Sequence, residues 1–384
     1  MTEVEITDYR NKIDAIDEKM VKLFCERMEL AKDIASYKKE NGLPVLDTER
    51  ERKLLDKVED AAGSDMGDYT RRLYTTALEL SRSYQNSLNL GASALTKNIE
   101  DALSKTPQLF PEKAVVACQG VEGAYSVRAC EKLFEKPSVM YFQTFDAVFK
   151  AVEKGLCEYG VVPLENSTAG SVNMTYSLMD RYRFHIVRST KIQIEHCLLT
   201  QDGTKLGDIK KVYSHPQAIE QCSVFLDSLG KDVEVIPCEN TAMAAKRVSE
   251  TGAGSAAIAS EKCCAEYNLS AAEKNIQNTD NNYTRFICFS KDIQIFPGAD
   301  KTSLLVRTPH RVGALYHVMA QLYSNGINIL KLESRPIPGS DFEFMFYFDL
   351  EGSVYSERLL NAIRSIENTL GTQNVKYLGS YREK

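Results

Sequence analysis

The sequence lacks several features that identify whole classes of protein. It has no apolar run long enough to cross a bilayer and no secretory signal segment, so we expect neither a membrane protein nor an exported one. It also lacks a Gly-rich phosphate loop, a dinucleotide-binding fingerprint and the Cys/His spacings of metal sites. We therefore expect no nucleotide cofactor and no metal.

Charge and cysteine usage narrow the range of expected partners and cellular compartments. The formal net charge is -6, so no overall field draws the chain to nucleic acid or to an anionic membrane, and we expect neither as a partner. The 10 Cys are scattered, and Cys263-Cys264 is the only close pair, which favours structural thiols in a reducing cytoplasm. A length of 384 residues, with 43% hydrophobic and 26% charged residues, is typical of a globular protein of two to four domains.

One polar stretch, Asn281-Asn282-Tyr283-Thr284-Arg285-Phe286, leads into the apolar residues Ile287-Cys288-Phe289. This pattern predicts a polar loop that enters a strand. Because side chains alternate along a strand, Asn282, Thr284 and Phe286 are expected to share a face, and Arg285 to point away. Thr284 would then be a fixed hydroxyl in a polar pocket. The alternative is an ordinary strand start with turn-forming Asn residues.

An apolar heptad pattern at the start of the chain predicts a helix over residues 6–37. One series of positions holds Ile6, Ile13, Met20, Arg27 and Ile34, and the other holds Tyr9, Ile16, Leu23, Leu30 and Tyr37. Such a helix is roughly 48 Å long. It is too long for a small domain to cover alone, so we expect partner helices from a second chain.

Arg27 interrupts this apolar seam. A buried guanidinium without an anion is costly, which leaves either a salt bridge to a Glu or an anion site inside a helical bundle. Lys38 lies nearly three turns further on and faces the same way. Arg10 lies roughly 25 Å from Arg27 along the axis. It can therefore share a small-molecule site with Arg27 only from an antiparallel partner chain.

Two further helices are expected before residue 90. Gly42 and Pro44 end the first helix, and Asp47 or Thr48 is expected to cap the second. A loop over residues 61–67 should separate it from a third helix over residues 68–88. One stripe of the third helix, mostly apolar, consists of Tyr74, Leu78, Ser81, Gln85 and Leu88.

In order and spacing, these residues resemble the all-helical chorismate mutases, which are intertwined dimers. The resemblance is carried by residues 9–14, 26–30, 38, 47–52, 81 and 85. It implies that Arg27 and Arg10 of the partner subunit hold the two carboxylates of chorismate, and that Lys38 and Gln85 reach the ether oxygen. It also implies that the remaining site residues surround the ring: Asp47, Arg50, Glu51 and Ser81.

The implied reaction suits these residue types. The Claisen rearrangement is unimolecular and needs no nucleophile or proton transfer, so fixed cations and an amide suffice to hold the compact conformer and to stabilise charge on the breaking bond. The alternative is a helical dimerisation module without catalysis.

The middle of the chain has a different pattern of apolar and polar residues. Residues 91–111 are small, polar and weakly patterned, which predicts a linker with at most a helical turn. Short apolar runs then alternate with helical patterns, which predicts a mainly parallel sheet. Strands are expected over residues 114–118, 139–142, 159–164, 185–200, 233–237 and 256–259, with Asp146 capping a helix. Ligands bind beyond the carboxyl ends of such strands, near helix N-termini. Residues 165–172, 214–217 and 240–241 lie at such places, although helix capping explains each one singly.

Residues 112–290 resemble prephenate dehydratase in the motifs at 120–126, 162–172, 214–217 and 284–286. Val121 stands where that family often has Pro. The resemblance implies two lobes like those of periplasmic binding proteins, with a site in the cleft where prephenate loses carbon dioxide and hydroxide to give phenylpyruvate. It makes Thr284 the proton donor to the departing hydroxide. The expected substrate-binding residues are Asn166, Ser167, Thr168, Ser214, His215, Gln217, Asn282, Arg285 and Phe286. His215 is also a candidate acid, but its position before Pro216 at a helix start favours capping or ligand orientation.

The last part of the chain has a βαββαβ pattern, which is ferredoxin-like. A hairpin is expected around Gly339-Ser340, with Phe342, Phe344, Phe346 and Phe348 on one face of its second strand. Two motifs resemble the ACT domain of this dehydratase family, which binds phenylalanine at a dimer interface. They are Gly313-Ala314-Leu315 and Glu333-Ser334-Arg335-Pro336. The alternative is a domain kept for dimer packing.

The predicted architecture is multidomain. All-α chorismate mutase helices over 1–90 and a linker over 91–111 precede a two-lobed α/β, periplasmic-binding-protein-like dehydratase over 112–290 and an α+β ferredoxin-like ACT domain over 300–384. The whole chain resembles the bifunctional chorismate mutase–prephenate dehydratases of phenylalanine biosynthesis. This implies chorismate and prephenate as substrates, feedback inhibition by phenylalanine, and a homodimer or higher homo-oligomer.

An alternative from another class is an amino-acid-sensing regulator built from the same modules without catalysis. A DNA-binding helix pair or a basic stripe would favour it, and the sequence has neither. The sequence leaves open whether prephenate or arogenate is preferred, and whether the product of the first reaction moves directly to the second site.

Overall fold

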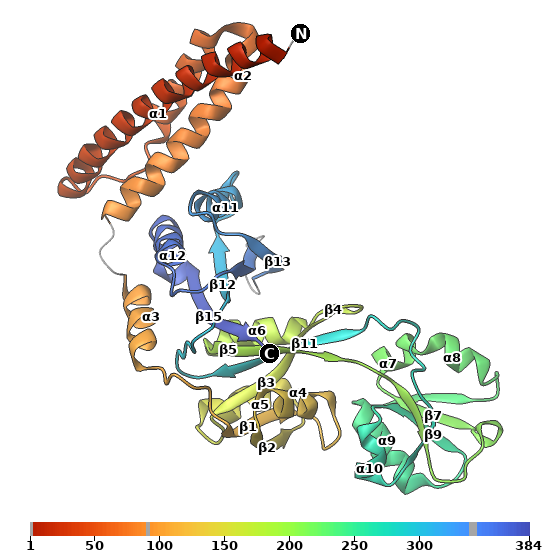
Figure 1. Ribbon diagram of the computed structural model, residues 1–384. Helices are drawn as coiled ribbons and strands as arrows, with labels where there is room; N and C mark the ends of the chain where they lie inside the picture. Colours follow the sequence, from red (N-terminus) through yellow and green to blue (C-terminus); the bar gives the residue numbers. More distant parts are fainter. Residues whose placement is uncertain (1–2, 90–92, 338–343) are drawn as a thin grey trace. The chain divides into compact units, whose positions relative to one another are not determined.

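The computed structural model describes residues 3–89, 93–337 and 344–384 (Figure 1). The chain forms two compact units, each built from several stretches. The first unit holds residues 1–97, 306–347 and 354–375, and the second holds residues 98–305, 348–353 and 376–384. Three strands supply residues to both units: β12 (Lys301–Thr308), β14 (Phe344–Glu351) and β15 (Val375–Glu383). The predicted hairpin turn at Gly339-Ser340 and the side chain of Phe342 lie outside the described residues.

The N-terminal part of the first unit consists of α1 (Glu3–Glu40) and α2 (Thr48–Asn89). The helix predicted over 6–37 is confirmed. Asp47 is the cap of the second helix, because its Oδ1 accepts a hydrogen bond of 3.0 Å from the N–H of Arg50. The predicted break between two helices is present: α2 consists of two helical arms joined at Gly63, where the backbone is non-helical with φ of 75° and ψ of 175°. The break is narrower than the loop predicted over 61–67, because the alanines before Gly63 favour helix and a glycine tolerates that φ.

The apolar seam of α1 is not the face that α2 covers. Where the two helices meet, Ala31 and Ala35 are buried. By contrast, Leu23 and Leu30 of the seam are 63% and 65% exposed. The other large seam residues that are exposed are Tyr9, Ile13, Ile16, Met20, Ile34 and Tyr37. Among the described residues, α1 therefore keeps a long apolar face open to solvent.

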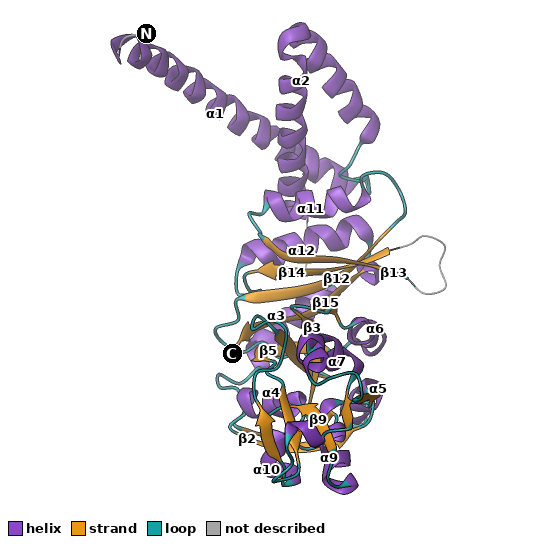
Figure 2. Ribbon diagram, turned by 90° about the vertical axis from the view of Figure 1, so that its right-hand side faces the viewer, coloured by secondary structure: helices purple, strands orange, loops and turns teal. Residues whose placement is uncertain are grey.

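The C-terminal elements follow the predicted βαββαβ order. After β12 come α11 (Ala314–Ser324), β13 (Ile329–Pro336), β14, α12 (Glu357–Leu370), the short 3₁₀ helix η2 (Thr372–Asn374) and β15. The strand order is β13-β14-β12-β15. Within the first unit, α11 and α12 lie on one side of β13 (Figure 2) and also contact α2. The Tyr316 hydroxyl of α11 donates to the Glu79 carboxylate of α2, and the Asn86 amide donates to Ser365 Oγ of α12.

The second unit contains two lobes (Figure 1). The first-lobe sheet has the order β5 (His185–Gln193), β11 (Tyr283–Ser290), β3 (Tyr159–Asn166), β1 (Lys113–Gln119) and β2 (Lys136–Phe142), with β4 (Gly170–Ser171) beside β3. Its helices are α4 (Tyr125–Leu133), α5 (Phe145–Glu153) and α6 (Asn173–Tyr182). α3 (Ala94–Lys105) precedes this lobe in sequence.

The second lobe is a five-stranded sheet with helices. Its strand order is β10 (Ser270–Glu273), β6 (Cys197–Thr200), β9 (Ser255–Ala259), β7 (Lys211–Ser214) and β8 (Glu234–Pro237). Its helical segments are η1 (Leu206–Asp208), α7 (Pro216–Gln221), α8 (Ser223–Ser228), α9 (Thr241–Thr251) and α10 (Lys262–Tyr267). A continuous cluster of buried apolar side chains extends through both lobes, from Val116 and Phe286 to Leu199 and Ala257. The lobes therefore share this cluster, and the second lobe has a further cluster of its own around Val212 and Ile258.

Four expectations for this unit need correction. The mainly parallel sheet is mixed in each lobe, because β11 and β6 run antiparallel to both neighbours. The strand predicted over 185–200 is two strands in different sheets, since the chain crosses between lobes there. The region expected to hold at most a helical turn contains the 12-residue helix α3. Thr144, and not Asp146, caps α5, because its side chain accepts from the N–H of Ala147.

No helix among the described residues is long and apolar enough to cross a membrane.

Candidate active sites

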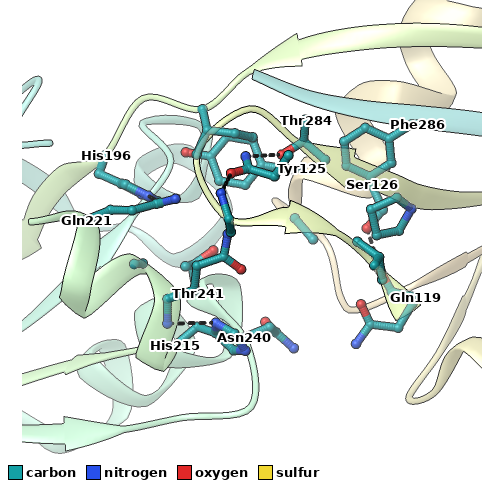
Figure 3. Close-up of a pocket in the computed structure, with 18 of the residues that line it drawn as sticks. Gln119, Tyr125, Ser126, His196, His215, Gln221, Asn240, Thr241, Thr284 and Phe286 are labelled. Carbon is teal, nitrogen blue, oxygen red and sulfur yellow. Dashed lines mark hydrogen bonds between the residues drawn. The ribbon is translucent and has the colours of Figure 1, made fainter. Parts of the chain in front are cut away.

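A cavity of about 430 Å³ lies between the two lobes of the second unit (Figure 3). The first lobe contributes Thr284 and Phe286 from β11 and Asn166 from the end of β3. The second lobe contributes residues at the starts of two helices, His215 before α7 and Asn240 before α9. The carboxyl end of β3, the amino end of the antiparallel strand β11 and the beginnings of two helices thus meet at one place, which suits a ligand site in an α/β fold.

Asn166 holds the Thr284 side chain in this cavity. The Asn166 Nδ2 donates hydrogen bonds of 2.9 Å to Thr284 Oγ1 and 2.8 Å to Asn282 Oδ1. Its Oδ1 accepts from the backbone N–H groups of Thr168 and Ala169, at 3.1 and 2.8 Å. Thr284 is 9% exposed. Its hydroxyl accepts this hydrogen bond and, among the described residues, donates none to the protein. The hydroxyl hydrogen is therefore available to a ligand.

Arg285 points away from Thr284, as the strand alternation predicts, but it does not line the cavity. Its Nη1 donates to Asp349 at 2.6 Å and to Glu165 at 3.0 Å, and its Nη2 donates to the Tyr381 hydroxyl at 2.7 Å. The guanidinium is buried and neutralised in this network. The expectation that Arg285 contacts a ligand directly is therefore not supported by its position.

The other predicted binding residues divide into two groups. Phe286, His215 and Gln217 line the cavity. Ser167, Thr168, Ser214 and Asn282 lie behind its wall: the Ser214 hydroxyl donates to the carbonyl of Ile258, and Ser167 bonds to the backbone of β11 and the loop before it. These four shape the loops that carry the lining residues.

Several lining residues escaped the sequence prediction. They are Gln119, Tyr125, Ser126, His196 and Gln221. Asn240 and Thr241, which the sequence places at a helix start of the kind that binds ligands, also line the cavity. Tyr125 and Ser126 follow the glycine-rich turn of the dehydratase-like motif, and Gln221 lies one turn after Gln217 on α7. The position of these three residues next to predicted site segments is a signal that could have identified them. His196 lies in the crossing between lobes, inside the range 185–200 over which the sequence predicts a single strand.

Both histidines of the cavity are neutral near pH 7. Burial lowers the pKa of His196 and of His215 below the ordinary value. His215 Nδ1 accepts from the N–H of Gln217 at 3.2 Å, which places the proton of the neutral ring on Nε2. Burial also raises the pKa of Tyr125, which keeps its hydroxyl protonated. The cavity thus presents neutral donors and acceptors.

No Arg or Lys side chain of the described residues lines the cavity. A bound anion would instead meet backbone N–H groups, because the first turns of α4 and α9 face the cavity at Tyr125 and Thr241 (Figure 3). Helix N-termini attract carboxylates through these groups and through the helix dipole. The described residues contain no cluster of His, Cys, Asp and Glu arranged for a metal ion.

The predicted mutase residues are spread along α1 and α2. Ser81 and Gln85 are buried and bonded to each other at 3.2 Å, and Gln85 Oε1 has no partner among the described residues. Glu51, before the Gly63 kink of α2, forms an ion pair with Arg82, after the kink.

The four basic residues of this set differ in surroundings. The Arg27 guanidinium donates to the carbonyl of Ala77 at 3.4 Å, and Lys38 Nζ donates to that of Val45 at 2.6 Å. Arg10 and Arg50 are exposed.

The predicted phenylalanine-binding residues lie in the first unit. Gly313, with φ of 80°, precedes α11, and Ala314 and Leu315 begin that helix. The second motif, residues 333–336, forms the end of β13. Glu333 and Arg335 form an ion pair there.

Comparisons with known proteins agree with this division of the chain. The family model described as Chorismate mutase type II matches residues 9–86, and the one described as Prephenate dehydratase matches residues 116–294. A bifunctional chorismate mutase/prephenate dehydratase from Enterobacter agglomerans is 33% identical over 381 residues, covering 97% of this chain and 94% of that protein.

Two solved structures resemble the dehydratase and C-terminal part. The prephenate dehydratase from Arthrobacter aurescens in complex with L-Phe has a TM-score of 0.64 at 26% identity, over 70% of this chain and 89% of that one. A protein described as GqqA, a novel type of quorum quenching acylase, has a TM-score of 0.64 at 30% identity, over 70% and 98%. With two family models in order and a relative similar over almost its whole length, the chain belongs to the bifunctional chorismate mutase/prephenate dehydratase family.

Proposed function

We propose that the two reactions of this family take place in separate parts of the chain. Residues 9–86 rearrange chorismate to prephenate, and the cavity between the two lobes converts prephenate to phenylpyruvate. Phenylalanine, the amino acid that this pathway makes, binds the C-terminal βαββαβ elements and lowers the second activity.

One observation carries the dehydratase assignment: the Thr284 hydroxyl is held by Asn166 while its hydrogen stays available in the cavity. In the reaction the ring carboxylate leaves as carbon dioxide, and the electron pair of the broken C–C bond becomes part of the aromatic ring. The C–O bond breaks at the same time, and the oxygen leaves with its electron pair. Thr284 donates its proton to this oxygen, which departs as water, and the Thr284 oxygen takes a proton back from solvent water before the next turnover.

The rest of the cavity binds and orients the substrate. The first turns of α4 and α9 meet carboxylates of prephenate, and His215 donates from Nε2. Phe286 packs against the ring. Because these groups are neutral, they leave the carboxylate that departs as carbon dioxide without a strong counter-charge, so its electrons are free to move into the ring.

The mutase assignment requires a dimer. Arg27 and Arg10 lie too far apart on the single straight helix α1 to hold one small molecule. The exposed seam of α1 fits the same face of a second copy in antiparallel orientation, which brings Arg10 of the partner subunit to Arg27. Gln85, whose Oε1 is buried and unpaired among the described residues, then faces the substrate together with Lys38, as the resemblance implies. The remaining set of Asp47, Arg50, Glu51 and Ser81 completes this site.

The C-terminal elements form an ACT domain in this proposal. Gly313 lets the backbone approach a ligand closely at the start of α11, where the helix dipole favours a carboxylate. β13 is the edge strand of its sheet, and Leu330 and Leu332 are exposed on it. An apolar edge of this kind suits a second subunit, so the phenylalanine site lies where Gly313 and residues 333–336 of two chains meet.

Product analysis tests the whole assignment. Purified protein is given chorismate or prephenate separately, with and without phenylalanine, and prephenate and phenylpyruvate are quantified. We expect chorismate to give both products, prephenate to give phenylpyruvate, and phenylalanine to suppress phenylpyruvate formation. Absence of phenylpyruvate from prephenate would refute the dehydratase assignment, and arogenate offered in parallel identifies the preferred substrate.

A further inference from the structure

A line of hydrogen-bonded side chains runs from His196 to Thr284 across the two lobes of the second unit. His196 Nε2 lies 3.1 Å from Gln221 Oε1, and Gln221 Nε2 lies 2.9 Å from Thr168 Oγ1. The Thr168 hydroxyl is 2.7 Å from Asn166 Oδ1, and Asn166 Nδ2 is 2.9 Å from Thr284 Oγ1. Figure 3 shows His196 and Gln221 side by side on one side of the cavity and Thr284 on another.

The direction of every bond in this line follows from two backbone groups. The N–H groups of Thr168 and Ala169 can only donate, and both reach one oxygen of Asn166, which identifies that atom as Oδ1. Asn166 therefore turns its NH₂ group towards Thr284. Because Asn166 Oδ1 only accepts, the Thr168 hydroxyl must give its hydrogen to it.

The same logic continues to His196. The Thr168 oxygen, having given its hydrogen away, accepts from the NH₂ group of Gln221, so Gln221 presents its oxygen to His196. That oxygen needs a donor, and His196 supplies Nε2–H. Nδ1 of His196 then carries a lone pair, and this buried atom has no partner among the described residues. His196 is 2% exposed, so neither this tautomer nor the ring orientation is set by solvent.

We propose that His196 is a positioning residue for the dehydratase reaction: by donating to Gln221 it holds Gln221 and Thr168 in the orientation that completes the line to Asn166, and it thereby supports the Thr284 hydroxyl as a hydrogen donor towards the substrate. All donors in the line point the same way, so the last hydrogen, that of Thr284, has no protein acceptor and is directed to the ligand. Each bond polarises the next, which strengthens the donor at the end of the line. The inference rests on the proposed role of Thr284 as proton donor.

The line also joins the two lobes. Gln221 ends α7 in the second lobe, Thr168 follows β3 in the first, and His196 lies in the segment that crosses between them. The Gln221–Thr168 bond is therefore a contact between lobes that exists only when they are close together. Closing of the lobes around a substrate therefore also completes the line of hydrogen bonds that ends at Thr284.

Four variants test this line of hydrogen bonds, which we call the relay. The mutase activity of each preparation measures the amount of active protein, and denaturant unfolding followed by circular dichroism measures the folding of the dehydratase lobes. His196→Phe keeps a ring of similar shape but removes the donor, and we expect the dehydratase kcat to fall about 10²-fold, as for a misplaced catalytic group. His196→Gln places an amide N–H near the position of Nε2, and we expect it to recover most of that loss. Gln221→Met is expected to lower kcat similarly. The double variant His196→Phe/Gln221→Met should be no slower than Gln221→Met alone, because both act through one line.

The outcomes separate the relay from a merely structural role. If the factors by which the two single variants lower kcat multiply in the double variant, His196 does not act through Gln221, and the proposal is overturned. Unchanged kcat in His196→Phe would overturn it as well. If His196→Phe does not fold, the same cycle is run with Thr168→Val and Gln221→Met, where Thr168→Ser should restore kcat and additive losses again refute the relay.

Thr284→Val, measured in the same series, distinguishes a failure of the proposed role of Thr284 from a failure of the relay alone. A fully active Thr284→Val protein means that the proposed function of Thr284 has failed. An inactive Thr284→Val protein combined with normal His196 and Gln221 variants means that only the relay has failed.

Discussion

Arg27 and Thr284 are the central residues of the two candidate sites, and their surroundings differ. Arg27 belongs to a helix whose neighbouring seam residues Leu23 and Leu30 are exposed. Thr284 is 9% exposed in a cavity whose walls come from one chain, with Asn166 holding its hydroxyl. A long amphipathic helix cannot bury its seam within a small domain, whereas two α/β lobes with a shared core can enclose a ligand. We therefore propose that the first site depends on a second copy of the chain and that the second site does not.

The largest expected effect comes from removing the central residue of each site. We expect Thr284→Val to lower the dehydratase kcat by about 10²- to 10⁴-fold, because a positioned proton donor contributes that much. The mutase activity of the same protein should be unchanged. Arg27→Ala should do the reverse, because it removes a fixed cation from the rearrangement site.

Both activities are measured on each preparation, by chorismate loss and by phenylpyruvate formation. Thr284→Ser is the matched control, since it keeps the hydroxyl and should retain most of the dehydratase turnover. Loss of both activities in either variant, with the fold intact, would contradict the separation of the sites.

The next effect concerns stability in acid, which should differ between residues 3–89 and the second unit. Residues 3–89 contain no histidine, whereas the second unit contains the half-buried His185, whose Nδ1 donates to the carbonyl of Tyr377 at 3.0 Å. Burial lowers the pKa of His185 from 6.5 to about 4. The unfolded chain therefore takes up a proton between pH 6.5 and about 4 that the folded chain refuses, so this contribution to stability is complete above pH 6.5 and is lost as the pH falls.

This loss amounts to about 1.4 kcal/mol per pH unit, or on the order of 3 kcal/mol over the window. His185→Asn keeps a donor for Tyr377 but does not titrate, so its unfolding free energy should fall less than that of the wild type between pH 7 and 4.5. Denaturant unfolding at several pH values measures the difference, and His310→Asn, at an exposed position, serves as control. Parallel pH curves for wild type and His185→Asn would show that His185 is not the group responsible.

A smaller effect is expected at the proposed phenylalanine site. A side chain at Gly313, where φ is 80°, strains the turn before α11 and occupies the space where a ligand backbone would approach. We expect Gly313→Val to weaken phenylalanine binding about tenfold or more, equivalent to at least about 1.4 kcal/mol, and to leave the uninhibited dehydratase rate unchanged.

Calorimetry measures the binding, and the inhibition curve for phenylpyruvate formation measures the response. Gly326→Val is the matched control, because Gly326 also has a positive φ, of 67°, and lies in the same unit with open space around it. Equal losses in the two variants would point to general strain in the unit. Unchanged binding in Gly313→Val would place the phenylalanine site elsewhere.

The parts of the fold and of the site that sequence predicted well are those governed by local rules. Heptad spacing predicts α1, alternation along β11 predicts that Thr284 and Arg285 face opposite ways, and Asp47 caps α2 as its residue type suggests. What sequence missed depends on contacts between distant segments. Arg285 is satisfied by Asp349 and Tyr381 far along the chain, and no local pattern could show that. His196 was similarly hidden, because a strand pattern cannot reveal where a chain crosses from one lobe to another.

The comparison of the two sites is sharpest when defective chains are mixed. Arg10→Ala and Arg27→Ala chains are each expected to lack mutase activity, but a heterodimer purified by two different tags contains one site with both arginines intact. By two-fold symmetry it should recover about half of the wild-type mutase activity per dimer. Mixing Thr284→Val with Asn166→Ala chains should recover no dehydratase activity, because both residues belong to the cavity of one chain.

Recovery in the first mixture and none in the second would follow from one site shared between chains and one contained within a chain. A confirmed Arg10→Ala/Arg27→Ala heterodimer without mutase activity would refute the shared site. Recovery in the Thr284→Val/Asn166→Ala heterodimer would mean that the dehydratase cavity also draws residues from a second chain. The exposed seam of α1 accounts for the first expectation, and the 2.9 Å bond between Asn166 and Thr284 of the same chain accounts for the second.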